Sequence, residues 1–494
     1  MTGGAAIREA FQAAARAHAE RPAVRAGPAV WTYGELLERA EACRSAIASR
    51  LDAGPVLFAP RNTRESVAAM LGAIGSGRVP LFADPTWTSA ELESVVRRCG
   101  VAGYLSQGNL PLAGAWEPAA PVLEGLGLAR RVPAPGEDAP RVPRPDTAFG
   151  RFTSGTTAFS RCLEFTDAAA LAAAAGWRKA AGIGPADRVL CLATLNNGLA
   201  FNTSLLTVLL AGGLLAFHSG PLVRSAMART LAAVEPTVLV AFPFVYEQFA
   251  RSARAWEVPR ALRLAVSSAA PLPADVREAW GREAGLRLCD YYGLVEVGPC
   301  TFNDGTVPGS LGAPLEGTSL IVTGDAGEPL SAGEAGQVRV KTPSMASGYL
   351  DGGGPPFSEN LDADGYYRTK DRAAVTPEGV LRLMGRMDEL VNVAGRKISP
   401  AEVERVLRTL PGVQDALVRG EVADGRAILA AYVESQSVQR QEVVDFCVAR
   451  LAPYKIPQRI AVLAALPRSA TGKPSLGSID ARAGGAAPGM EETR

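Results

Sequence analysis

The sequence predicts an α/β protein with a large N-terminal domain of parallel-rich sheets covered by helices, a small β subdomain, and then a small α+β domain. Three observations predict this. The 494 residues exceed one ordinary domain. Apolar, β-branched runs alternate with helical stretches, as parallel sheets require. The pattern changes near residue 385, so we place domains at 1–385 and 386–480 and a disordered tail at 481–494.

The elements of the first domain follow from hydrophobic periodicity. Three apolar runs predict buried strands, namely VLCLATL (189–195), TVLVAF (237–242) and LRLAVSS (262–268). Residues 274–285 have the spacing of an amphipathic helix. The apolar stretch 204–217 is too short to cross a bilayer and predicts a buried helix and strand. The Pro/Gly-rich residues 132–145 form a loop between two blocks, and 324–342 form a hairpin-rich β region.

The second domain begins with a predicted hairpin at 385–399. Ser399, Pro400 and Glu402 then have the pattern of a capping box with proline at the first helical position. Two strands, DALVRG and ILAAYVE, and a second helix, VQRQEVVDFCVARL, complete an α+β unit.

Charge and rare residues exclude several classes of protein. The 51 Lys and Arg balance 50 Asp and Glu, which argues against nucleic acid as a partner. Two histidines, His18 and His218, exclude a multi-histidine metal site and disfavour a Ser-His-Asp enzyme. Seven cysteines without a CxxC pair indicate reduced thiols. With no signal peptide or membrane segment visible, we expect a cytoplasmic protein without a membrane partner.

The strongest local signal is FTSGTT at 152–157. Backbone N–H groups of such a loop form an anion-binding nest, and its hydroxyls add donors for phosphate oxygens. For the hexapeptide alone, a polar surface turn would be the default interpretation, and the other motifs of the chain give it its weight. The chain has no Walker loop and no convincing dinucleotide-binding fingerprint.

Further motifs follow in a fixed order. They are DYYGLVE (290–296), VPGSLGAPLEG (307–317), GYYRTKD (365–371), GRMD (385–388), AGRKISPAEVE (394–404) and SATGK (469–473). With these motifs the chain resembles the adenylate-forming superfamily of acyl- and aryl-CoA synthetases, luciferases and nonribosomal peptide synthetase adenylation domains. The resemblance covers nearly the whole chain, and it identifies a divergent member.

The resemblance implies a mobile C-terminal domain and two half-reactions. A carboxylate attacks the α-phosphorus of ATP, releasing pyrophosphate, and a thiol then takes the acyl group. It implies ATP and Mg²⁺ as cofactors, with CoA or the phosphopantetheine of a carrier protein as acceptor. We therefore expect an AMP-forming acid–thiol ligase for a small aryl or acyl carboxylic acid, with a role in secondary metabolism.

Site residues carry over by position in the motifs. The resemblance implies catalytic roles for Lys473, Glu296 and Arg161, with Glu296 also the Mg²⁺ ligand. It implies nucleotide binding by Thr153, Ser154, Gly155, Thr156, Thr157, Asp290, Tyr291, Tyr292, Gly293, Asp371 and Arg386. Asp388 matches the hinge and Gly395 the pantetheine tunnel. The alternatives are a core role for Tyr292, a turn at Asp388 and a hairpin glycine at Gly395.

The chain also departs from the family pattern. Arg161 stands where relatives have a phosphate-loop lysine, and the two side chains are not interchangeable. Val295 replaces a threonine whose hydroxyl meets the α-phosphate, which removes a donor worth about 1–3 kcal/mol. Lys370 replaces a glycine beside the ribose site.

For the acid pocket we expect Asn196, Asn197, Gly198 and Ser268. The two asparagines either bond a polar group of the substrate or cap a helix, and Gly198 leaves room for an aromatic ring. No aspartate lies between residues 190 and 219 to hold an ammonium group, which disfavours an α-amino acid.

Two other hypotheses remain. A divergent ligase of this family gives a non-thiol product, as an amide synthetase or as a diazotase that activates nitrite for an aryl amine. Alternatively, the chain is a catalytically weak binder of AMP or an acyl group. Retention of Glu296, Asp371 and Lys473 together favours catalysis. The sequence does not predict an oligomeric state.

Overall fold

The computed structural model describes residues 3–51, 53–107, 116–117, 120–132, 142–153, 160–250, 257–269, 272–352, 355–387, 391–393, 396–398, 400–423, 426–451 and 455–468. The chain folds into two compact units. Unit 1 is Met1–Ser319 with Val340–Tyr367, and unit 2 is Leu320–Arg339 with Arg368–Arg494. This division differs from the predicted boundary at residue 385, which, like the predicted tail, stays a prediction.

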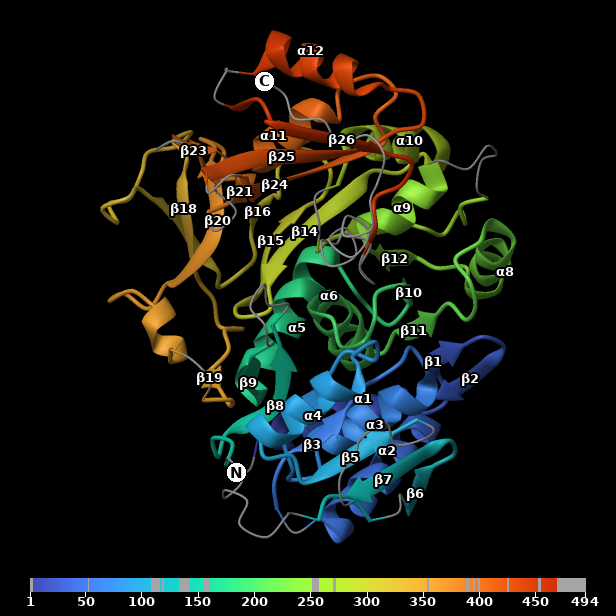
Figure 1. The fold of residues 1–494 in the computed structure, drawn as a ribbon. Coiled ribbons are helices and arrows are strands. Elements are labelled where there is room, and N and C mark those ends of the chain that lie inside the picture. The colour runs from blue at the N-terminus through green and yellow to red at the C-terminus, as the bar shows by residue number, and fades with distance from the viewer. Residues whose placement is uncertain are drawn as a thin grey trace. The chain divides into compact units, whose positions relative to one another are not determined.

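Unit 1 contains a nine-stranded sheet whose central strands are parallel (Figure 1). Its spatial order is β16 (Ala313–Pro314), β15 (Gly298–Asn303), β14 (Leu288–Leu294), β13 (Leu264–Ser267), β12 (Val238–Ala241), β10 (Arg188–Cys191), β11 (Leu214–Phe217), β1 (Pro22–Ala26) and β2 (Ala29–Thr32). Strands β10, β12 and β13 lie within the three apolar runs and confirm the prediction that these runs form strands. Their residues are buried apart from Arg188, as expected for strands inside a parallel sheet.

The second sheet of unit 1 has eight strands. Its order is β19 (Gly348–Tyr349), β9 (Cys162–Thr166), β8 (Thr147–Phe152), β4 (Pro80–Phe82), β3 (Val56–Phe58), β5 (Gly103–Ser106), β7 (Leu126–Arg130) and β6 (Ala120–Leu123). Strands β8 and β9 pair antiparallel, so the predicted phosphate loop connects two direct neighbours.

Helices surround these sheets. They are α1 (Ala5–Ala17), α2 (Tyr33–Arg50), α3 (Arg64–Ile74), α4 (Ser89–Arg98), α5 (Asp167–Ala181), α8 (Arg224–Val234), α9 (Pro243–Ala250), α10 (Ala274–Ala284) and the 3₁₀ turn η2 (Phe357–Asn360). Capping boxes begin α2, with Thr32 and Glu35, and α4, with Thr88 and Glu91. Helix α10 confirms the predicted amphipathic helix.

One helical stretch has an unusual interior. It comprises α6 (Gly198–Ala200), the π-helical segment η1 (Phe201–Leu206) and α7 (Thr207–Ala211), and β11 follows. The predicted buried helix and strand are therefore present, but periodicity did not predict the π-helical turns. At their C-terminal end, the Thr207 hydroxyl donates to the Asn202 carbonyl at 2.6 Å. Such turns occur frequently at functional sites.

The described part of unit 2 contains three small sheets and two helices. A four-stranded sheet, largely in this unit, has the order β17 (Ser319–Thr323), β18 (Gly336–Lys341), β20 (Tyr367–Val375) and β21 (Leu381–Arg386). The predicted hairpin contains β22 (Val391–Val393) and β23 (Arg396–Ile398). Next come α11 (Pro400–Leu407), β24 (Asp415–Ala423), β25 (Arg426–Glu434), α12 (Arg440–Arg450) and β26 (Arg459–Leu463). Helix α11 begins at Pro400 as predicted, while Ser399 lies outside the described residues.

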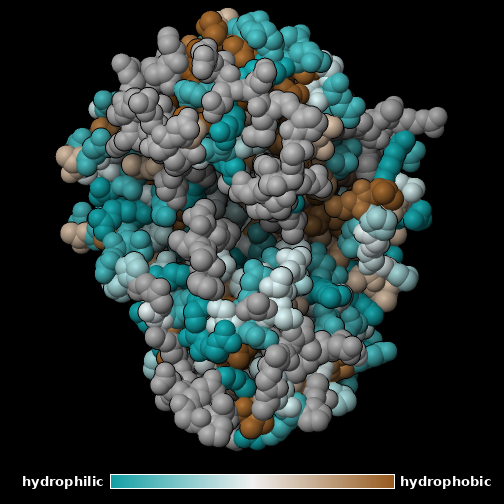
Figure 2. All heavy atoms as spheres, in the orientation of Figure 1, coloured by the Kyte–Doolittle hydropathy of each residue, from teal (hydrophilic) through white to brown (hydrophobic). Residues whose placement is uncertain are grey.

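The state of the cysteines agrees with the sequence analysis. All seven cysteines are free and buried, as predicted. On the face in Figure 2, hydrophobic residues form separate small groups among hydrophilic ones. In the described part of the chain, no helix combines the length and the apolar character needed to span a bilayer.

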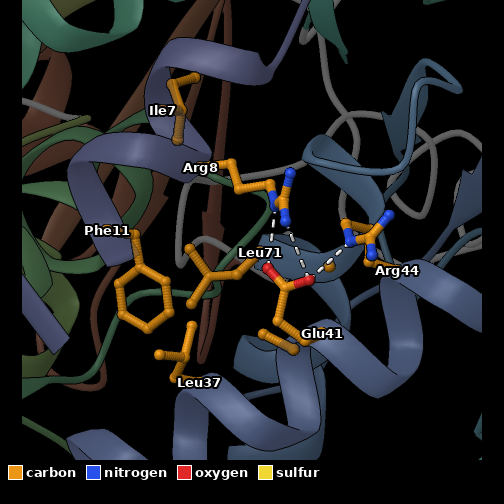
Figure 3. Close-up of a pocket in the computed structure, with 9 residues that line it drawn as sticks. Ile7, Arg8, Phe11, Leu37, Glu41, Arg44 and Leu71 are labelled. Atoms are coloured by element: carbon orange, nitrogen blue, oxygen red, sulfur yellow. Dashed lines mark hydrogen bonds and ion pairs between the residues drawn. The ribbon is translucent and has the colours of Figure 1, made fainter. Parts of the chain in front are cut away.

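A small cavity lies between α1, α2 and α3 (Figure 3). Its volume of about 10 Å³ suits a single water at most. At its rim, Glu41 accepts hydrogen bonds from Arg8 Nε at 2.9 Å, Arg44 Nε at 2.6 Å and Gln12 Nε2 at 2.9 Å. Burial raises the pKa of Glu41, but these bonds outweigh burial and lower the pKa to about 2. The cavity is a packing gap, and its rim is an ion-pair cluster that ties α1 to α2.

Candidate active site

The base of the predicted phosphate loop is closed by Thr153 and Arg161. The Thr153 N–H donates to the Arg161 carbonyl at 2.9 Å, and the Arg161 N–H donates to Thr153 Oγ1 at 3.1 Å. These bonds extend the β8–β9 pairing to the two ends of the loop. The predicted nucleotide-binding residues Ser154, Gly155, Thr156 and Thr157 lie outside the described residues.

The Arg161 side chain is held by residues of its own unit. It donates to the carbonyls of Pro355 at 2.7 Å and Asp351 at 3.2 Å, and its Nε lies 3.7 Å from Asp351 Oδ1. Its guanidinium also lies over the Tyr349 ring. Arg98 pairs with the same Asp351 carboxylate. These contacts position the loop end, so the phosphate role predicted for Arg161 would require the side chain to leave them.

Strand β14 carries DYYG, and its residues alternate between two environments. Tyr291 is buried, packs edge-on against Trp177 at 5.2 Å and hydrogen-bonds Asn202, so its backbone is the part left to contact a nucleotide. Tyr292, also predicted to bind the nucleotide, follows on the opposite face of the strand and is 8% exposed.

Asp290 and Gly293, the first and last residues of DYYG, are each constrained by a neighbouring residue. Asp290 accepts a hydrogen bond from Arg277 Nη2 at 2.7 Å, a partner that the sequence did not reveal. Burial raises the pKa of Asp290, and Arg277 opposes that shift. A side chain at Gly293 would come within 2.5 Å of the Gly298 carbonyl oxygen, so glycine is required where β14 and β15 turn.

Glu296 lies in the turn between β14 and β15. Its backbone carbonyl accepts from the Ala346 N–H at 2.8 Å, which fixes the turn. The described residues contain no group of three or more His, Cys, Asp or Glu able to hold a metal ion. Mg²⁺ that arrives with a nucleotide needs only one or two protein carboxylates, because phosphates and water complete its shell. A single carboxylate at Glu296 fits such an ion.

The predicted pocket segment separates into distinct roles. Asn197 is the N-cap of α6, where its Oδ1 accepts from the Leu199 N–H at 2.9 Å, so the capping alternative is confirmed for this residue. Asn196 donates to Asp84 Oδ2 at 3.3 Å, while its own buried Oδ1 has no hydrogen-bond partner among the residues that the structure describes. Ser268 is 7% exposed and precedes Ala269, whose φ of +73° is a strained value for alanine.

Arg151, on β8, is a charged residue of this region that we did not predict. It is 4% exposed, and a Cβ on Gly198 would lie 2.8 Å from its Nη2. Its Nε is buried and has no hydrogen-bond partner within the described ranges of the chain. A signal was present, because arginine is the one charged residue in the apolar strand TAFGRF.

In unit 2, Asp371 and Arg386 are direct partners in the β20–β21 pairing. Asp371 Oδ1 lies 3.7 Å from Arg386 Nη1, and Asp371 is 4% exposed. The two predicted nucleotide-binding residues of this unit are thus brought together. The predicted lysine Lys473, the hinge residue Asp388 and the tunnel residue Gly395 lie outside the described residues.

Comparison with known proteins matches both parts of the chain to one family. The family model for AMP-binding enzymes matches residues 11–350, and the model for the C-terminal domain of AMP-binding enzymes matches residues 402–473.

Individual relatives are similar at low identity. A 3-hydroxybenzoate–CoA ligase of Aromatoleum sp. (strain CIB) is 27% identical, over 92% of both chains. Syringomycin synthase SyrB1 of Pseudomonas syringae pv. syringae is 27% identical, over 95% of this chain and 80% of the relative. A 2-succinylbenzoate–CoA ligase of Enterococcus faecalis is 33% identical over 39% of this chain and 40% of its own length.

Solved structures share the fold. ATP-bound MatB from Rhodopseudomonas palustris superposes with a TM-score of 0.80 at 22% identity, covering 95% of this chain and 97% of that one. The anthranilate CoA ligase AuaEII in complex with anthranoyl-AMP gives 0.79 at 22% identity, covering 97% and 96%.

Proposed function

Because the chain belongs to the AMP-binding enzyme family, we propose that it is an AMP-forming acid–thiol ligase. In the proposed reaction, a carboxylate oxygen bonds the α-phosphorus of ATP and the bond to pyrophosphate breaks. A thiol sulfur then bonds the acyl carbon, and AMP leaves. The observation that carries the proposal is the match of both family models, in order, to 11–350 and 402–473.

We propose a small aryl or acyl carboxylic acid as the substrate. Among the similar proteins, one is named for 3-hydroxybenzoate and another for 2-succinylbenzoate, which supports an aryl acid. The acceptor is CoA or the phosphopantetheine of a carrier protein. CoA ligases among the relatives support the first, and the match to a syringomycin synthase supports the second.

The proposed roles follow from chemistry at each position. The Tyr292 ring stacks on adenine, and the Asp371 carboxylate accepts the two ribose hydroxyls, as a charge-assisted pair. Glu296 would hold Mg²⁺, which would offset charge on the phosphates. Lys473 would bridge the attacking carboxylate and the α-phosphate, where a cation stabilises the charge that gathers in the transition state.

Arg161 and Val295 set this chain apart from its relatives. The contacts of Arg161 with Asp351 and Pro355 support a positioning role at the loop end. Val295 supplies no hydroxyl, so the α-phosphate would depend on the backbone of the loop and on Lys473. We expect a slower adenylation step than in relatives that have both groups.

The test is ATP–pyrophosphate exchange over a panel of carboxylic acids, followed by mass spectrometry with CoA, amines and nitrite. We expect exchange with at least one aryl or acyl acid and a thioester with CoA or a phosphopantetheine thiol. Exchange with no acid would overturn the proposal. ATP consumption only with an amine, or with an amine plus nitrite, would instead identify the amide synthetase or the diazotase.

A variant pair tests the lysine. Lys473→Ala should abolish exchange while AMP still binds. Lys179→Ala, which removes an exposed surface lysine paired with Glu316 at 2.7 Å, serves as the control and should keep full exchange. Adenylation that survives in Lys473→Ala would assign the role to another residue.

A further inference from the structure

Arg151 is a buried cation on β8. In the part of the chain that the structure describes, no carboxylate pairs with it, and its buried Nε has no hydrogen-bond partner. Burial lowers the pKa of Arg151 to about 10, and the nearby Tyr291 and Glu296 oppose that shift. The guanidinium is therefore still charged at neutral pH. A buried charge without a partner is strongly unfavourable, so a fold retains one where a ligand completes it.

The surroundings of the guanidinium do not supply that partner. The rings of Phe201 and Phe165 lie 5.4 and 5.9 Å from its central carbon, close to the limit of a cation–π contact. The helical stretch 198–211 begins at Gly198, beside Nη2, and the N-terminus of a helix carries partial positive charge. Two sources of positive potential thus lie together, and this arrangement suits an anion.

The position of Arg151 along β8 distinguishes the anion that it would bind from the carboxylate that reacts with ATP. Arg151 precedes Thr153, at the base of the predicted phosphate loop, by two residues, or about 6–7 Å of strand. Its guanidinium lies instead against Gly198, in the segment expected to line the acid pocket. An anion bound there belongs to the body of the acid rather than to the carboxylate that attacks phosphorus.

We propose that Arg151 is a specificity-determining residue that binds the second, non-reacting carboxylate of a dicarboxylic acid substrate. The inference rests on the proposed function, since it names the class of acid that the same site adenylates. The acid enters with one carboxylate toward the phosphate loop and the other against the guanidinium. Formation of this ion pair with the buried guanidinium selects diacids over acids that lack the second charge.

The experiment compares matched acids in the ATP–pyrophosphate exchange assay. The pairs are benzoate with the three benzenedicarboxylates, and butyrate with succinate. For wild type we expect kcat/KM for the best diacid to exceed that of its monoacid at least 10-fold. Arg151→Met should lower this diacid-to-monoacid ratio at least 30-fold, and Arg151→Lys should restore part of it.

A matched control is Arg188→Met. Arg188 also lies on a buried strand, and its Nε donates hydrogen bonds to the backbone carbonyls of Val234 and Glu235. Its loss should therefore leave the diacid-to-monoacid ratio at the wild-type value. A second measurement uses thermal unfolding without ligand. Arg151→Met should raise Tm, because it removes an uncompensated charge, whereas Arg188→Met should lower Tm.

The outcomes are distinct. Exchange with monoacids only, or a ratio that Arg151→Met does not change, overturns this inference and leaves the proposed function intact. Equal losses with both acids would place Arg151 at the reacting carboxylate, and this also overturns it. Exchange with no acid at all contradicts the proposed function itself.

Discussion

The guanidinium of Arg161 lies over the ring of Tyr349, with its central carbon 3.6 Å from the ring centroid. The same side chain pairs with Asp351, whose carboxylate is almost fully buried. Arg161→Met removes both contacts and leaves the buried carboxylate with Arg98 as its remaining ion-pair partner in the described part of the chain. We expect the free energy of unfolding to fall by about 2–3 kcal/mol, measured by urea denaturation.

Arg39→Met is the control for this variant. Arg39 lies over the Trp31 ring at 4.4 Å on the surface, and its loss should cost well under 1 kcal/mol. If Arg161→Met kept full stability but raised KM for ATP, the side chain would serve the phosphates after all.

Two helical glycines should respond to alanine in opposite ways. A Cβ at Gly198 would lie 2.8 Å from Nη2 of Arg151, so the flexible guanidinium must move. Gly198→Ala should therefore raise KM for the acid several-fold with little change in Tm. Gly176, inside α5, has open space at that position, so Gly176→Ala should add about 0.5–1 kcal/mol of stability and leave kinetics unchanged. An unchanged acid KM in Gly198→Ala would contradict the assigned contact.

The ion-pair cluster around Glu41 predicts a pH dependence of stability. The folded-state pKa of about 2 lies below the ordinary glutamate value of 4.5, so the carboxylate stabilises the fold above pH 4.5. That contribution is lost as the pH falls from 4.5 toward 2. Glu41→Gln should cost about 1–2 kcal/mol at pH 7, allowing for partial exposure, and should flatten the decline of stability as the pH falls from 4.5 toward 2.

Denaturation curves across this pH range test the cluster, with Glu38→Gln as the control because Glu38 is an exposed residue of the same helix. Equal effects of the two substitutions would show that the hydrogen bonds to Glu41 add nothing.

Asp371 is the residue proposed to accept the two ribose hydroxyls of the nucleotide. Asn at this position keeps the shape but loses the charge, which weakens two hydrogen bonds by about 1.4 kcal/mol or more in total. Asp371→Asn should therefore weaken AMP binding about 10-fold or more in calorimetry. Asp364→Asn, at an exposed turn, should bind AMP as wild type does. Unaltered binding in Asp371→Asn would remove this residue from the nucleotide site.

The sequence was sufficient for elements whose signal is local. Strands β10, β12 and β13 are short apolar runs with β-branched residues, and α11 begins at a proline, so neighbouring residues determine them. The π-helical turns of η1 were not predictable, because the same buried face suits an ordinary α-helix.

The contacts of the site residues also differ in whether local sequence could predict them. The structure pairs Asp371 and Arg386 directly on two neighbouring strands, while their roles in nucleotide binding stay a prediction. The partners of Arg161 and Asp290 were not predictable, since Asp351 lies 190 residues from the first and Arg277 is on a separate helix. Arg151 was visible as a charge in an apolar strand, but only the fold shows that its buried Nε finds no hydrogen-bond partner among the described residues.

The chain passes from one compact unit to the other three times, at 319–320, 339–340 and 367–368. A single proteolytic cut therefore cannot release either unit whole. A fragment that stops at residue 319 would lack β19, the edge strand beside β9, together with Asp351 and Tyr349, which hold Arg161. Truncation studies and chimeras of this protein should keep 340–367 with the N-terminal part, even when the C-terminal helices are removed or exchanged.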